Sequence, residues 1–274
     1  MSNRRVRSDG RRLDLTAALR EAVRTIPRVW RGAWGVLVLA AAVGLLPLLV
    51  PVSGVGHWAQ VVVFALILLM ALGALTRIGV TEELSYARML GLGPGGLQFG
   101  KPELRLVAAF LLCAIFMALI LVVLALVLLA AFGTADLDVA VIRDRSWLSH
   151  PGLLGPPWKL ALLALVTGVA LAVPLLLFVR LSLFAQATLG RGHAVSLNTM
   201  GIVHGSFWPL LAGIMITELP KLVLAVVGLA GLLRGDALWM VWVVMLALVQ
   251  APLTAGLFGA AYRQLEYWTP EIRA

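Results

Sequence analysis

A glutamate, a proline and a lysine stand within four positions of one apolar stretch, IMITELPKLVLAV, at residues 214–226. Charges inside such a stretch are costly in a membrane, so Glu218 and Lys221 are expected to face the interior of a helical bundle and to pair there. They lie three residues apart on nearly the same helix face, on either side of Pro220. Counted from Trp208, Glu218 is expected about 15 Å into the membrane, near its centre, at roughly 1.5 Å per residue.

Further polar groups and prolines extend this set. Thr217 adds a hydroxyl next to the pair, which is expected to accept a hydrogen bond from the lysine or from water. A helical proline pushes aside the carbonyl four residues earlier, so Pro174, Pro220 and Pro252 are expected to break their helices, and Pro252 to free the carbonyl of Leu248. Gln250 adds an amide close by. The sequence therefore predicts a polar pocket between the fourth, fifth and sixth spans of a membrane bundle.

Two interpretations of this polar set stay open. In the first, the two charges neutralise each other and the prolines only kink helices for packing. In the second, they line a path for a solute or a proton between broken helices, where transporters often hold their sites. The first three spans carry no matching combination of proline and charge.

No other pattern in the sequence indicates a catalytic or metal-binding site. The single cysteine, Cys113, lies in an apolar run, and the four histidines are scattered. We therefore predict no metal, no cofactor and no enzymatic activity. One loop, 134–157, contains three aspartates, and its prolines together with Trp147 and Trp158 favour a cover at the membrane interface. Its acidic residues and histidine are Asp136, Asp138, Asp144 and His150.

The composition is that of a membrane protein. Of the 274 residues, 61% are hydrophobic and only 13% are charged, and the mean hydropathy is +0.99. A soluble domain carries about a quarter charged residues, and a spanning helix needs about 20 mostly apolar ones. Six segments qualify, so we predict an all-α polytopic protein with six transmembrane helices. They are roughly 33–52, 59–76, 106–133, 159–180, 208–233 and 238–262.

The positive charge is distributed unevenly along the chain. The net charge is +9, and nine arginines precede the first predicted span. If the N-terminus faces the cytoplasm, seventeen Lys and Arg lie in cytoplasmic segments and four lie on the other side. This asymmetry predicts that both termini are cytoplasmic, and it favours anionic lipid rather than nucleic acid as the partner of the basic residues.

Apolar residues recur at helical spacing before the first span, from Leu15 to Ile26. This pattern predicts an amphipathic helix in the cytoplasmic interface, capped by Asp14, ended by Pro27 and with Thr25 on its polar face. Less regular amphipathic segments of the same kind precede the third and fifth predicted spans. The chain is thus divided into a basic segment (1–31), a bundle (32–268) and a tail (269–274). Four arginines are predicted to contact lipid headgroups: Arg20, Arg24, Arg28 and Arg31.

Small residues at a spacing of four form stripes on several spans. Such stripes let helix backbones approach closely in lipid. They predict a closely packed bundle within one chain, although a homodimer would use the same device. The stripes are Ala114 and Ala118 in the third span, Ala164, Gly168 and Ala172 in the fourth, and Ala251, Ala255 and Gly259 in the sixth.

A resemblance to known proteins rests on two segments of the sequence, LQFGKPELRLV and VRLSLFAQATLGRGHAVSLNTMGIVHGSFWPLL. They are similar to phrases in a group of uncharacterised six-span bacterial inner-membrane proteins. That group is distantly similar to the membrane domain attached to some glycerophosphodiester phosphodiesterases. The resemblance implies a fold and a place in the bacterial inner membrane. It carries over no catalytic residues, because the phosphodiesterase domain is absent from this chain.

We predict a non-enzymatic integral protein of the bacterial inner membrane that interacts with lipids or organises a partner protein. Its partners would be anionic headgroups on the cytoplasmic side, with a protein partner or a homodimer as further options. The alternative is a small-solute or proton-coupled transporter with its polar pocket between the fourth, fifth and sixth spans.

Overall fold

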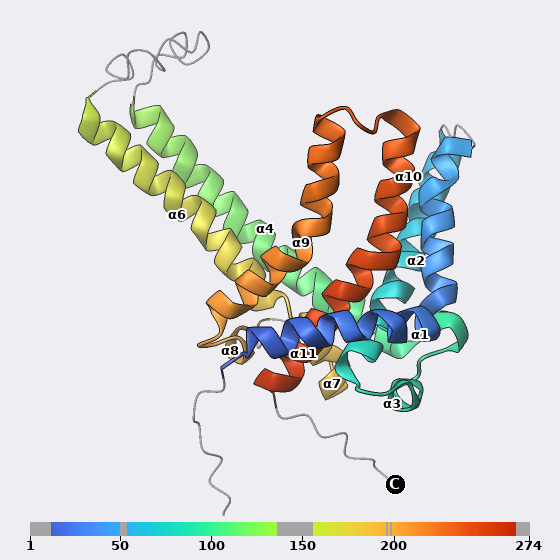
Figure 1. Ribbon diagram of the computed structural model, residues 1–274. Coiled ribbons are helices and arrows are strands. Elements are labelled where there is room, and N and C mark those ends of the chain that lie inside the picture. Colours follow the sequence, from blue (N-terminus) through green and yellow to red (C-terminus); the bar gives the residue numbers. More distant parts are fainter. Residues whose placement is uncertain (1–11, 50–53, 136–155, 196, 198, 267–274) are drawn as a thin grey trace, which may run out of the picture. The chain divides into compact units, whose positions relative to one another are not determined.

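The computed structural model describes residues 12–49, 54–135, 156–195, 197 and 199–266 (Figure 1). Within these ranges all regular elements are helices, and six segments are long and apolar enough to cross a membrane. The predicted all-α, six-span membrane protein is confirmed at this level. The predicted tail 269–274 and the loop residues Asp136, Asp138, Asp144 and His150 lie outside the described residues.

The chain divides into two units, which we describe separately. The first comprises residues 1–110 and 180–274, and the second residues 111–179. The helices are α1 (Leu15–Leu49), α2 (Val55–Val80), α3 (Leu84–Met89), η1 (Pro94–Gly96), α4 (Lys101–Ala135), α6 (Pro157–Leu181), α7 (Phe184–Arg191), α8 (Thr199–Ile202), α9 (Phe207–Leu229), α10 (Gly235–Met245), η4 (Leu246–Gln250) and α11 (Ala251–Leu265).

The second unit consists of most of α4 and α6. Its helices expose long rows of apolar side chains, as spans that face lipid do. The small-residue stripe predicted in the fourth span makes no close contact in this unit. A Cβ placed on Gly168 would meet no described atom within 4 Å.

In the first unit, α1 consists of two helical parts joined by a kink. Its first part lies across one end of the bundle, which we call the basal end, and its second part runs along the bundle (Figure 1). The prediction that Pro27 ends the first helix is wrong, because the helix passes through Pro27 and departs from helical geometry at Ala33 (φ −126°, ψ 18°). The bend accommodates the turn of η1. A Cβ on Gly96 would lie 2.9 Å from the Ala33 Cα, so only glycine permits this approach.

The first part of α1 packs against α11 through small side chains. A Cβ on Gly256 would lie 2.7 Å from the Ala22 Cα, which brings the two backbones together. Thr25, predicted on the polar face, is buried instead, and its hydroxyl donates to the Glu21 carbonyl at 2.8 Å. Val23, predicted on the apolar face, is exposed. The buried face of this part of α1 therefore differs from the predicted apolar face and is formed mostly by small residues. Its members are Ala18, Ala22, Thr25, Val29 and Ala33.

Helix α11 lies at the centre of the first unit. A Cβ on Gly79 would lie 2.5 Å from the Ala255 carbonyl oxygen, and a Cβ on Gly259 would collide with the Gly79 backbone. These contacts bind α2 to the stripe predicted in the sixth span. In lipid, where the hydrophobic effect does not drive helices together, such close backbone packing holds a bundle.

A buried ion pair fixes the start of α4. Arg77 Nη1 lies 2.6 Å from Glu103 Oε1, and both side chains are 1% exposed. Arg77 Nε donates to the Leu90 carbonyl at 2.9 Å, and Glu103 Oε2 accepts from the Gly100 amide at 2.9 Å. The pair thus connects α2, the segment that carries η1 and the first turn of α4.

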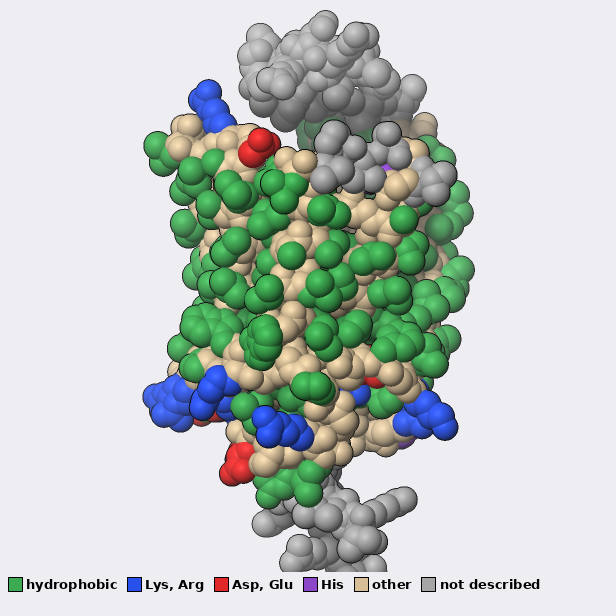
Figure 2. All heavy atoms as spheres, turned by 90° about the vertical axis from the view of Figure 1, so that its right-hand side faces the viewer, with side chains coloured by type: hydrophobic (Ala, Val, Ile, Leu, Met, Phe, Trp, Pro, Cys, Tyr) green, Lys and Arg blue, Asp and Glu red, His purple; other side chains and the backbone are tan. Residues whose placement is uncertain are grey.

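Figure 2 shows one face of the molecule, on which hydrophobic side chains form a broad band. Lys and Arg side chains gather below this band, at the basal end. An apolar band with a concentration of positive charge at one border is the pattern expected of a membrane protein.

Candidate binding cavity

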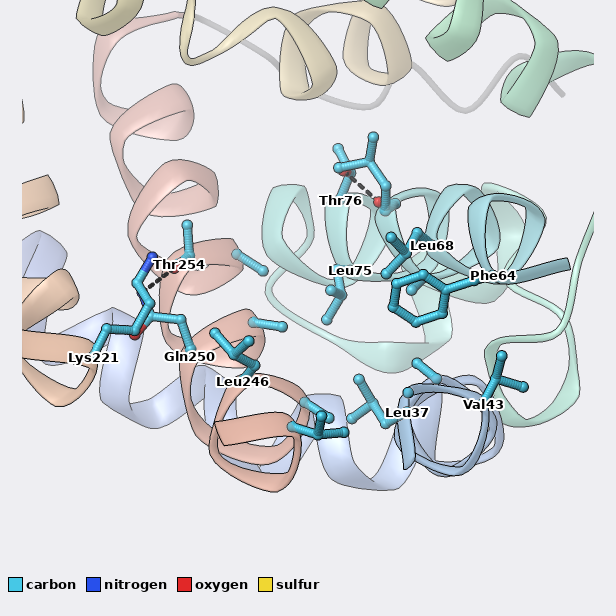
Figure 3. Close-up of a pocket in the computed structure, with 18 of the residues that line it drawn as sticks. Leu37, Val43, Phe64, Leu68, Leu75, Thr76, Lys221, Leu246, Gln250 and Thr254 are labelled. Carbon is cyan, nitrogen blue, oxygen red and sulfur yellow. Dashed lines mark hydrogen bonds between the residues drawn. The ribbon is translucent and has the colours of Figure 1, made fainter. Parts of the chain in front are cut away.

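The first unit contains a partly open cavity of about 790 Å³ (Figure 3). Its walls come from α1, α2, α10, η4 and α11, and α9 and α7 add residues to them. Ligand pockets in proteins commonly measure about 300–1,000 Å³ and are mostly apolar with a few polar groups. The volume of this cavity lies in that range, and its lining is likewise mostly apolar with a few polar groups.

The apolar part of the lining extends along most of α2. Between His57 and Thr76, the lining residues of this helix span about 28 Å at roughly 1.5 Å per residue. Phe64, Leu68 and Leu75 form this wall, opposite aliphatic side chains of α1 and η4 (Figure 3). The cavity is therefore long, and nearly as long as the hydrocarbon core of a bilayer is thick, about 30 Å.

A polar cluster interrupts the apolar lining. The Glu218 carboxylate forms an ion pair with the Lys221 ammonium and accepts a hydrogen bond from Gln250 Nε2 at 3.1 Å. Gln250 Nε2 also donates to the Thr254 hydroxyl at 3.2 Å. The side chains of Glu218 and Lys221 are 32% and 29% exposed, so neither charge is sealed in the protein. The structure thus brings three of the predicted site residues together and adds Thr254.

The helix geometry around Gln250 follows from Pro252. The five residues of η4 form a π-helical turn that ends two residues before the proline. Pro252 has no N–H to donate to the Leu248 carbonyl four residues earlier. That carbonyl accepts a hydrogen bond from Trp30 Nε1 of α1 at 2.8 Å. This hydrogen bond therefore attaches α1 to the turn that carries Gln250.

Two predicted site residues lie elsewhere. The buried Thr217 hydroxyl donates to the Ile214 carbonyl at 2.9 Å rather than accepting from the lysine, and Thr217 does not line the cavity. Pro174 belongs to α6 of the second unit, so the predicted contribution of the fourth span to the pocket stays a prediction. The cavity lies among the first, second, fifth and sixth spans, because these pack around α11.

The cluster lies toward the basal end of the cavity. Ala255 packs against Gly79, next to the last residue of α2. Gln250 precedes Ala255 by five residues and lies about 8 Å further from that end, at roughly 1.5 Å per residue. Glu218, which accepts a hydrogen bond from Gln250, lies at the same height as Gln250. It is therefore nearer to the basal end than the predicted position near the membrane centre. Figure 1 gives the reason, since α9 runs obliquely through its first turns.

Two amide oxygens of the lining lack partners. Gln250 Oε1 and Gln186 Oε1 are both buried, and neither has a hydrogen-bond partner among the described residues. Our reading of the sequence did not single out Gln186, Thr76 or Thr254. Thr254 could have been found, because it follows Gln250 by one helical turn. Gln186 belongs to the short helix α7, and nothing local in the sequence indicates that it lines the cavity.

The four arginines predicted to contact headgroups lie at the basal end, in the first part of α1, and three of them are exposed: Arg20, Arg24 and Arg31. Arg28 differs from them. Its guanidinium pairs with the Glu21 carboxylate and donates to the Thr25 hydroxyl at 2.8 Å and to the Glu82 carbonyl. Arg28 therefore ties α1 to the segment after α2.

Among the residues described, no group of three or more His, Cys, Asp or Glu is arranged to hold a metal ion. No known protein family, curated protein or solved structure matches the chain. The resemblance to the six-span inner-membrane group thus stays a prediction, and the cavity has to be interpreted from its own chemistry.

Proposed function

We propose that this protein is a non-enzymatic membrane protein that binds a lipid in the cavity described above. An acyl chain lies along the apolar wall of α2, and the headgroup lies at the cluster around Glu218 and Lys221. The observation that carries this proposal is the shape of the lining, which is long and apolar with its charges near one end. This is the pattern of polarity of a lipid molecule.

The partial exposure of the ion pair supports the proposal. Charges that face hydrocarbon are costly, even when they are paired. A headgroup at the cluster gives both charges polar neighbours, while the apolar wall gives the acyl chain the close packing that it has in the bilayer. A small polar solute would leave most of the apolar wall without a partner.

Two leucines of α2 provide a matched test. Leu68 lines the cavity and is 47% exposed, whereas Leu66 is 46% exposed and does not line it. Leu68→Trp fills the cavity, and Leu66→Trp adds the same bulk outside it. Native mass spectrometry of the purified full chain is expected to show bound lipid with Leu66→Trp and a loss of at least ten-fold with Leu68→Trp. Equal retention by the two variants would refute lipid binding in the cavity.

We further propose that the protein lies in a bacterial inner membrane with both termini in the cytoplasm. The distribution of Lys and Arg along the sequence supports this orientation. The exposed Arg20 and Arg24 are placed to contact anionic headgroups on that side. Charge reversal at both positions is expected to remove anionic lipid adducts from the purified protein. Unchanged adducts would exclude this contact.

A second candidate function is transport of a small solute or a proton. The observation in its favour is that a carboxylate, an ammonium and an amide meet in one cavity. It predicts that Glu218→Gln abolishes flux in proteoliposomes while the bundle stays folded. Lipid binding predicts no flux of small solutes with either the parent or the variant.

A further inference from the structure

The polar cluster restricts the headgroup that the cavity can bind, an inference that rests on the proposed lipid binding. The first restriction is charge. Glu218 and Lys221 are the only charged residues in the described lining of the cavity, and together they are neutral. An anionic headgroup finds a single cation whose charge is already balanced by a carboxylate. A zwitterionic headgroup can place its phosphate at Lys221 and its cation at Glu218, so that each charge meets its opposite.

The second restriction is the balance of hydrogen-bond donors and acceptors. The Glu218 side chain lines the cavity and is 32% exposed, and an ionised carboxylate only accepts hydrogen bonds. The cluster therefore favours a ligand that donates hydrogen bonds to Glu218. A primary ammonium has three N–H donors, and a trimethylammonium has none.

The third restriction is position. The cluster lies toward the basal end of the cavity, so a headgroup at the cluster leaves the rest of the cavity to the acyl chain. The acyl chain then extends along α2 toward His57. This direction is that of a lipid in the leaflet at the basal end.

We infer that the cavity selects a lipid whose headgroup combines a phosphate with a primary ammonium. The phosphate contacts Lys221, and the ammonium donates to Glu218. Phosphatidylethanolamine has this chemistry. Phosphatidylcholine has the same charges without the N–H donors, and phosphatidylglycerol has hydroxyl donors without the cation.

The test is competition among these three lipids with identical dioleoyl chains. The delipidated full chain receives an equimolar mixture, and native mass spectrometry measures the lipid retained. We expect at least ten-fold more phosphatidylethanolamine than either competitor. The variant Glu218→Gln/Lys221→Gln, which keeps amides in place of the charges, is expected to retain the three lipids within two-fold of one another. Leu66→Trp serves as the control and is expected to keep the preference.

The outcomes separate this inference from the function on which it rests. Equal retention of the three lipids by the parent, with loss of all three in Leu68→Trp, overturns the headgroup selection and leaves lipid binding intact. A preference for phosphatidylglycerol or phosphatidylcholine overturns the selection as well. A preference that survives the double amide variant shows that the cluster does not cause it. No difference between Leu68→Trp and Leu66→Trp overturns both proposals.

Discussion

The first unit contains two ion pairs that differ in almost every physical respect. Arg77 and Glu103 come from different helices and are sealed from solvent, and both have further hydrogen bonds to the backbone. Glu218 and Lys221 come from one turn of α9 and are about a third exposed. A buried pair with satisfied partners fixes the parts of a protein that it connects.

This difference shows which part of the first unit is sealed by packing and which part remains accessible. We call Arg77–Glu103 the closed pair and Glu218–Lys221 the open pair. Around the closed pair, Gly73 leaves just enough room for the two side chains. At the open pair, Glu218 and Lys221 line the cavity and keep about a third of their side-chain surface exposed. The closed pair therefore supports the architecture, and the open pair keeps its capacity for a ligand.

The largest expected effect comes from removing one partner of the closed pair. Arg77→Met leaves the Glu103 carboxylate buried without its cation, and breaking a buried pair in this way costs about 3–5 kcal/mol. The measurement is the free energy of unfolding in mixed micelles, with Arg88→Met as the control because Arg88 is exposed. A loss below about 1 kcal/mol would contradict the structural role of the pair.

A smaller loss of unfolding free energy is expected when both partners of the closed pair are kept but are pushed aside by an added methyl group. A Cβ on Gly73 would lie 2.8 Å from Glu103 Oε1 and 3.0 Å from Arg77 Nη1. Gly73→Ala therefore overpacks the site, with an expected loss of about 1–3 kcal/mol in the same unfolding measurement. Gly168→Ala, where a Cβ meets nothing within 4 Å, is the matched control and is expected to be neutral or slightly stabilising. The same loss in both variants would show that crowding of the pair is not the cause.

The open pair is expected to contribute less to stability than the closed pair, because both of its side chains are about a third exposed. A double-mutant cycle of Glu218→Ala and Lys221→Ala is therefore expected to give a smaller coupling energy than a cycle of Arg77→Met and Glu103→Met. If each single variant is strongly destabilised and the double variant recovers, the two charges exist to satisfy each other. The comparison with the closed pair would then fail, and the lipid site would lose the support that it takes from the open pair.

The smallest effect is expected at Asp14, a third charged position that is fully exposed. Hydrogen bonds from the Ala17 amide and the Thr16 hydroxyl hold the pKa of Asp14 below its ordinary value of 3.8. Its stabilisation of the α1 start is therefore present above pH 3.8 and is lost as the pH falls through the lower, folded-state pKa. Asp14→Ala is expected to remove this small dependence from unfolding curves recorded between pH 6 and 3. An identical dependence in the variant would assign it to another carboxylate.

The same two pairs show what the sequence could predict. Glu218, Lys221 and Gln250 were found because polar residues stand out within apolar runs. Arg77 and Glu103 were missed because they lie at the ends of spans, where charges are ordinary. They are also 26 residues apart, and nothing local indicates that their helices meet.

The apolar residues that line the cavity could not be identified from the sequence, for a related reason. In an apolar span, the side chains that face lipid and those that face a cavity are chemically alike. Leu66 and Leu68 illustrate this, because only the arrangement of the helices around α11 distinguishes them. The bend at Ala33 likewise depends on the distant Gly96, whereas the sequence drew attention to Pro27.

The bond from Trp30 to the Leu248 carbonyl has an optical consequence. The indole of Trp30 is held two residues from Gln250, and a second indole, that of Trp239, lines the cavity and donates to the Gly44 carbonyl at 3.0 Å. Indole fluorescence changes with the polarity and hydrogen bonding around the ring. The chain thus carries its own reporters of cavity occupancy, and titration with lipid can be followed by emission without a label.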